Sequence, residues 1–341
     1  MPEINQIPAF RVGTDVLPPR HRFDATRALM GPLYDLVPEP GERYPAMRLE
    51  GYRLNGVVVN KRTFGRHSFV RGTAHVRRHD TDHIAVRLSL AGSSKLTIGG
   101  VPVVMGPGSV TLLDRRFEMH GSTEPGMIIG SMLPRPSIGT GLLERNPAIC
   151  WPAGSPQARL VGNALLSLWA ELPRAHVEEG RDLAHGITSL IDGLLTSRPD
   201  SARREVLEQA TLAAMGRFIS RNLNNLELDA ATLCRAFGCS RARLYRLFQP
   251  WGGVHRYIQG QRLQRCFEEL SSAEPNRGRI SMLAATWGFE DHSHLHRRFK
   301  ARFGIAPSDV HTIGRPAGPG QGNTLPCNAQ IAELHHWLGR T

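Results

Sequence analysis

A duplicated motif constrains the fold of this 341-residue chain more than any other feature. The two copies are residues 233–248 and 283–299. Leu233 and Gly238 match Leu283 and Gly288 at an offset of 50 residues. A leucine, an arginine and a phenylalanine that follow match at an offset of 51, because one residue is inserted after the glycine. Self-similarity of this kind indicates one structural unit used twice.

Each copy predicts two short helices joined at a glycine turn. In the first copy, Gly238 can adopt a positive φ and end one helix, and Ser240 can cap the next. Leu233 and Leu244 then lie where the two helices face each other. In the second copy, Asp291 is the candidate cap. Each copy therefore predicts a helix-turn-helix, although a single copy would fit an ordinary helical hairpin equally well.

Two copies in register favour a DNA-binding function, because the second helix of such a unit can enter the major groove. The side chains that we expect at the DNA are Ser240, Arg241, Arg243, Tyr245 and Arg246 in the first copy, and Glu290, Asp291, His292, His294 and Arg297 in the second. Residues 254–270 lack proline and predict a connecting helix about 25 Å long. Such a helix can hold two recognition helices in successive major-groove segments, about 34 Å apart.

Across residues 226–310 the sequence resembles the AraC/XylS family of bacterial transcription regulators. The matching residues are Ser240, Leu244, Arg246, Leu247 and Phe248, then Trp287, Gly288, Phe289, Asp291, Ser293, His294, Phe299 and Lys300, and the run 302–308. Residues 249–253 depart from the family pattern, as does Leu295, where an aromatic residue is common. The resemblance implies binding to double-stranded DNA, contact with RNA polymerase, and activation of a promoter rather than repression.

Charge and composition agree with this interpretation. The chain has a formal net charge of +12. Residues 203–313 hold 17 basic and 10 acidic residues, whereas residues 1–202 hold 23 and 19, so positive charge is denser around the repeat. The sequence has no run of 18 apolar residues and does not begin with a secretory pattern. With five scattered cysteines, these features predict a cytoplasmic protein without a membrane span.

The first half of the chain predicts an antiparallel β-barrel, because short β-rich runs alternate with glycine and proline turns. The expected strands are residues 55–60, 68–77, 83–90, 94–98, 101–105, 109–114 and 126–132. This region resembles the cupin-like sensor domain found before AraC-type DNA-binding domains. The sequence thus predicts an α+β protein with a cupin-like effector-binding or dimerisation domain and helical connector (1–202), an all-α domain with two helix-turn-helix motifs (203–313), and a flexible tail with a short helix (314–341).

The resemblance implies a small organic effector in the barrel. Alternation along residues 83–90 predicts one apolar face and one face that carries Arg87. Arg77 and Arg87 are the candidate effector contacts, since a guanidinium matches a carboxylate, although surface arginines are the plainer explanation. The apolar stripe of residues 158–172 fits either packing on the barrel or a homodimer contact.

Two other classes of function stay open. A cupin-type metalloenzyme would need a His-x-His pair with a later glutamate and histidine, and the barrel region lacks that pattern. His75, His79 and His83 recur every four residues, but a turn at residues 80–82 would separate them. We therefore expect no metal, no cofactor and no enzyme activity. An effector-independent dimeric DNA-binding protein is the remaining alternative.

Overall fold

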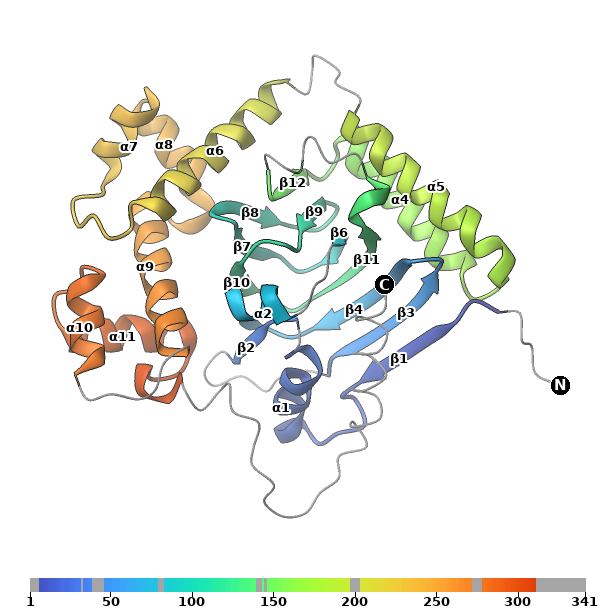
Figure 1. Cartoon of the computed structure of the whole chain (residues 1–341), viewed down its shortest axis with the longest axis horizontal. Coiled ribbons are helices and arrows are strands. Elements are labelled where there is room, and N and C mark those ends of the chain that lie inside the picture. Colours follow the sequence, from blue (N-terminus) through green and yellow to red (C-terminus); the bar gives the residue numbers. More distant parts are fainter. Residues whose placement is uncertain are drawn as a thin grey trace.

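The computed structural model describes residues 6–31, 33–38, 46–78, 83–138, 143, 146–196, 203–271 and 278–310. The side chains of residues 38, 77, 78 and 203–210 lie outside this description, as do the predicted tail and His79. Figure 1 shows a β-rich part in the centre, with a helical pair on one flank and a group of helices on the other. The predicted α+β architecture, with a sheet-rich first part and a helical second part, is confirmed.

Two antiparallel sheets form the β part. The larger contains, in order, β1 (Ala9–Gly13), β3 (Arg48–Leu54), β4 (Val57–Phe64), β11 (Gly126–Pro134), β6 (His83–Ala91), β9 (Val110–Asp114) and β12 (Ala148–Trp151). The smaller contains β2 (Asp35–Pro38), β5 (His67–Arg71), β10 (Met119–Thr123), β7 (Ser94–Ile98) and β8 (Val101–Met105). Helix α1 (Pro19–Met30) packs beside β2. One apolar core fills the space between the two sheets, so we call them together the barrel.

Two predicted strands have different limits in the structure. The strand expected at residues 68–77 ends at Arg71, and α2 (Thr73–Arg78) follows it after Gly72. The strand expected at residues 55–60 is β4. It begins later because Asn55 and Gly56 both adopt a positive φ, 39° and 87°, in the turn that joins β3 to β4. The limits were predicted wrongly because helical residues of α2 were assigned to the first strand and turn residues to the second.

Strand β6 divides its side chains between two environments, as its alternation predicts. Ile84, Val86 and Leu88 point away from the barrel interior and belong to a second core. That core also contains α4 (Pro156–Glu171) and α5 (Val177–Thr196), which cover the outer face of the larger sheet. The amphipathic stripe of α4 therefore packs on the barrel, and Arg87 lies on the opposite, inward side of β6.

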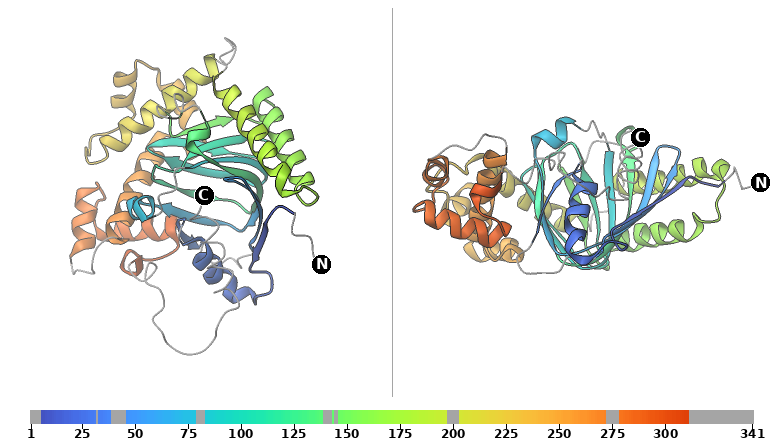
Figure 2. Two further views of the ribbon diagram at one scale, coloured as in Figure 1. Left: turned by 45° about the vertical axis from the view of Figure 1, so that its right-hand side comes forward. Right: turned by 90° about the horizontal axis from the view of Figure 1, so that it is seen from below.

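The helical part contains six α-helices among the described residues. They are α6 (Arg203–Arg221), α7 (Ala230–Phe237), α8 (Arg241–Phe248), α9 (Val254–Ser271), α10 (Arg279–Thr286) and α11 (His292–Phe303). Helices α6, α7 and α8 share one apolar core with the first half of α9. Helices α10 and α11 share another with its second half. Figures 1 and 2 show both groups on the same side of the barrel, away from α4 and α5, with α9 between them.

Candidate nucleic-acid interface

Helices α7 and α8 form the first helix-turn-helix. Gly238 ends α7 with a φ of 57°, a conformation that a side chain would disfavour. The Ser240 hydroxyl accepts a hydrogen bond from the backbone N–H of Arg243 at 3.3 Å and so caps α8. Leu244 and Phe248 are fully buried in the core with α6 and α9. This packing fixes α8 and leaves its other face to solvent.

Helices α10 and α11 repeat this arrangement. Gly288 makes the turn with a φ of 71°. The Asp291 carboxylate accepts a hydrogen bond from the backbone N–H of His294 at 2.6 Å, and this bond holds the pKa of Asp291 below its ordinary value. Leu295 and Phe299 are fully buried, as Leu244 and Phe248 are in the first unit. The duplicated sequence therefore forms a duplicated structure.

The exposed faces of α8 and α11 carry most of the predicted DNA contacts. Those that are exposed to solvent are Arg241, Arg243, Tyr245 and Arg246 on α8, and His292 and Arg297 on α11, with Glu290 in the turn before it. His294 is half-buried against the ring of Phe289. Ser240 and Asp291 act as helix caps. Besides any direct contact with DNA, they would therefore orient the helix that they cap.

Three further side chains are exposed along α11: His296, Arg298 and Lys300. Arg298 and Lys300 were not predicted as DNA contacts, whereas DNA contact or solvent exposure was expected for His296. The signal for Arg298 and Lys300 was present, because residues three or four apart on a helix share a face. In structural register, Arg297 corresponds to Arg246, since the second helices align at an offset of 51 residues.

Helix α9 sets the separation of the two units. Its 18 residues span about 27 Å. Gly252 and Gly253, with φ values of 76° and 97°, form the tight turn that leads into it. The buried Arg262 side chain in the middle of α9 donates hydrogen bonds to the carbonyl groups of Leu223 and Asn225 at 3.1 and 2.8 Å. This ties the segment after α6 to the connecting helix.

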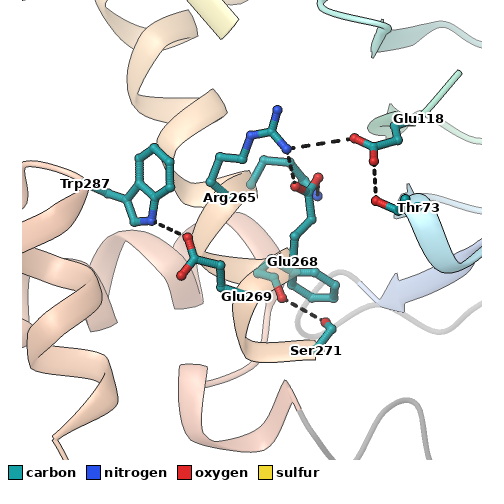
Figure 3. Close-up of polar contacts among 9 residues, drawn as sticks. Thr73, Glu118, Arg265, Glu268, Glu269, Ser271 and Trp287 are labelled. Carbon is teal, nitrogen blue, oxygen red and sulfur yellow. Dashed lines mark hydrogen bonds and ion pairs between the residues drawn. The ribbon is translucent and has the colours of Figure 1, made fainter. Parts of the chain in front are cut away.

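The second unit is held to α9 by polar contacts as well as by its core (Figure 3). The indole N–H of Trp287 donates to the Glu269 carboxylate at 3.0 Å. Arg265 pairs with Glu268 at 2.8 Å on the same helix and reaches Glu118 of the barrel at 3.8 Å. Helix α9 is therefore both the spacer between the units and a contact with the barrel.

Comparison with known proteins agrees with this geometry. A helix-turn-helix domain family matches residues 233–312. The crystal structure of the AraC-like transcriptional activator CuxR superposes with a TM-score of 0.51 and 28% sequence identity, over 76% of this chain and 96% of that one. Over most of its length, the protein is therefore similar to an AraC-like transcriptional activator.

Two relatives extend the comparison to sequence. The transcriptional activator NphR of Rhodococcus sp. is 26% identical over 285 residues, which cover 79% of this chain and 82% of NphR. The transcriptional activator RhrA of Rhizobium meliloti (strain 1021) is 28% identical over 107 residues, which cover 31% of this chain and 34% of RhrA. The likeness to NphR thus includes residues from the barrel as well as the helical part.

The barrel contains the second candidate site. Arg87 lines two adjoining cavities of about 20 and 60 Å³, together with Tyr34 and Arg62. Arg115 lines the larger of the two. Arg87 was among the predicted effector contacts, whereas Arg62 was not, because the strand that carries it was expected to end at residue 60. The side chain of Arg77, the other predicted effector contact, lies outside the described residues.

The barrel and the helical part also make direct contact. The Gln261 amide donates to the Thr97 hydroxyl at 3.0 Å, and Val37 and Val70 of the barrel belong to the core of the second unit. Gly216 of α6 lies so close to Gly100 that an added Cβ would fall 2.1 Å from the Gly100 carbonyl oxygen. These contacts link the barrel to both helix-turn-helix units.

No cluster of three or more metal-binding side chains occurs within the described part of the chain. Of the three regularly spaced histidines, His75 lies on α2 with its ring 3.2 Å from the Gly31 carbonyl oxygen, and His83 is buried on β6. In the same residues, none of the helices is both long enough and apolar enough to cross a membrane.

Proposed function

We propose that this protein is an AraC-type, sequence-specific transcription activator that reads two adjacent major-groove segments of one DNA duplex. One observation carries the proposal: a single buried helix, α9, joins two helix-turn-helix units whose recognition helices expose basic and hydrogen-bonding side chains. The N-terminal residues of α8 and α11, beginning with Arg241 and His292, would reach the base edges. Lys300 and the other exposed cations would contact phosphates.

We propose further that a small organic effector in the barrel controls this activity. A cavity of about 530 Å³ supports such coupling, because the barrel and the ends of both recognition helices line it. Lys95 and His120 come from the barrel, Gln249 follows α8, and Arg302 lies near the end of α11. A movement of the barrel wall would therefore change the positions of both helix-turn-helix units together.

The remaining assignments follow from this function. Residues 1–202 form the effector-binding domain with its connector, and residues 203–313 form the DNA-binding domain. Exposed Leu160 and Leu166 on α4 offer a contact for a homodimer. A cytoplasmic location and contact with RNA polymerase are expected of an activator, as NphR and RhrA are named. The proposal includes no enzyme activity.

The test is to map bound sites across the genome of the source organism and then footprint the strongest site. We expect protection of two neighbouring major-groove segments. The Arg243→Ala variant should lose protection in one segment and the Arg297→Ala variant in the other, because the two arginines lie on different recognition helices. Replacement of Arg20, an exposed arginine of the barrel domain, serves as the control.

Salt dependence provides a second check on the same site. Each neutralised phosphate releases counterions, so affinity should fall steeply between 50 and 200 mM salt. If both recognition-helix variants give the parent footprint, the two-unit function is wrong. Affinity that is independent of salt would contradict a phosphate-contacting interface.

A further inference from the structure

Four arginines converge inside the barrel. Arg62 comes from β4, Arg71 from the end of β5, Arg87 from the middle of β6, and Arg115 directly follows β9. Arg62, Arg87 and Arg115 line the larger internal cavity. Arg71 does not line this cavity but is bonded to the backbone next to it: it donates hydrogen bonds to the carbonyl groups of Leu33 at 2.7 Å and Arg115 at 3.4 Å.

No described carboxylate pairs with the three arginines that line the cavity. Arg62 donates to the Tyr34 hydroxyl, and its Nε atom is buried without a hydrogen bond. Two guanidinium nitrogens of Arg115, Nε and Nη2, are also buried without one. Asp114, next to Arg115 in sequence, pairs instead with Arg116 and Arg135. The cluster thus concentrates positive charge without a matching anion from the described protein.

Buried, mutually repelling positive charges destabilise the folded protein when no anion is bound. Burial, together with the nearby charge of Arg62, lowers the pKa of Arg87 from 12.5 to about 10. Burial likewise lowers the pKa of Arg115 to about 9, with added repulsion from Arg71, Arg87 and Arg62. Both groups nevertheless remain charged near neutral pH. Buried charges are normally paired, so an anion held among these guanidinium groups would relieve both the desolvation and the mutual repulsion.

The cavity walls limit the size of this anion. The two adjoining cavities have volumes of about 20 and 60 Å³. The larger has room for about five water molecules, since one water needs roughly 10–15 Å³ by this measure. Apolar side chains complete the walls, among them Leu33, Leu49 and Met132. The site therefore favours a compact molecule with acidic groups and little additional polar surface.

We propose that the effector of the barrel is a compact dianion, a short dicarboxylate or a phosphate group, held by Arg62, Arg87 and Arg115. The inference rests on the proposed function and names the chemical class of its effector. Planar guanidinium groups suit carboxylate and phosphate oxygens because they donate two parallel hydrogen bonds. Two negative charges fit the cluster better than one, because three unpaired cations face the cavity.

The experiment measures thermal unfolding of the full-length protein with four kinds of probe: the C3–C6 dicarboxylates, inorganic phosphate, butyrate and butanediol. We expect a dicarboxylate or phosphate to raise the Tm by about 3 °C or more at saturating concentration, and butyrate and butanediol to leave it within about 1 °C. Comparison of the Tm shifts produced by the dicarboxylates and by phosphate shows which of the two anionic groups the site binds.

Variants distinguish a ligand site from a structural arginine. Arg87→Met should abolish the shift and raise the Tm of the protein without added anion, because it removes an unpaired buried charge. A merely structural arginine would instead lower that Tm. Arg20→Met, on the surface of the same domain, should keep the shift.

The proposal is overturned if no dianion raises the Tm, if butyrate does so equally, or if Arg87→Met retains the shift. DNA footprinting without any added anion is run in parallel. A normal footprint together with no change of the Tm on anion addition would reject only the effector class. Absence of both the footprint and the Tm shift would reject the proposed function itself.

Discussion

The two helix-turn-helix units have the same buried scaffold and different exposed surfaces. Leu244 and Leu295 are both fully buried at corresponding positions, as are the phenylalanines four residues later. The exposed face of α8 is dominated by arginine, whereas that of α11 combines histidine, arginine and lysine. Since packing is shared and surface chemistry is not, the units should be equally important for folding but should read different base sequences.

The largest expected effect is on the shared scaffold. Leu244→Ala and Leu295→Ala should each reduce the free energy of unfolding by about 2–5 kcal/mol, because each opens a cavity in a close-packed core. Urea unfolding of the two variants measures this loss. A difference of more than about 3 kcal/mol between them would show that the two scaffolds are not equivalent.

The next effect concerns the exposed surfaces. Arg246→Ala and Arg297→Ala occupy matching positions on the two recognition helices and provide a paired test. Each should weaken binding to the full operator by about 1–3 kcal/mol if its guanidinium contacts a base. Competition binding assays should use operators mutated in one half-site. Each variant should no longer discriminate between parent and mutated bases in the half-site that its altered recognition helix contacts. If both variants lost discrimination at the same operator positions, the assignment of one half-site to each recognition helix would be contradicted.

The smallest effect separates the two helix caps. Ser240 caps α8 with a hydroxyl, and Asp291 caps α11 with a carboxylate. The pKa of Asp291 is lowered in the folded protein, chiefly by the hydrogen bond from the His294 backbone. Its contribution is therefore complete above the pKa of an unfolded aspartate, about 3.9, and is lost as the pH falls through the lower folded value. The Ser240 cap should not change over this range.

Amide hydrogen exchange can follow this difference directly. After correction for the intrinsic rate, protection of the His294 N–H should fall between pH 5 and pH 2.5, while protection of the Arg243 N–H stays constant. In an Asp291→Asn variant the pH dependence should disappear. Parallel loss at both positions would point to general acid unfolding rather than to one cap.

The sequence predicted the helical part well because its information is local. Glycine turns, caps and apolar spacing, such as Gly238 with Ser240 and Leu244, act within one or two helical turns. The α9 spacer was predicted in the same way and observed at residues 254–271.

The barrel was harder to predict because its structure depends on distant pairings. Strand β10, for example, pairs with β5 and β7, and no local pattern marks it. The cluster of Arg62, Arg87 and Arg115 comes from strands far apart in sequence, so only the folded sheets bring these side chains together. Arg87 was selected from strand alternation, but that pattern could not show that other arginines would join it.

The central claim is that both recognition helices contact one duplex at the same time. It is tested most directly by placing a photo-crosslinking amino acid at position 241 or at position 292, the first residues of α8 and α11, and mapping the crosslinked bases on the operator. We predict two crosslink sites on the same side of the duplex, about one helical turn apart. Crosslinks from both positions at the same base pairs, or from only one position on a fully bound operator, would contradict the account.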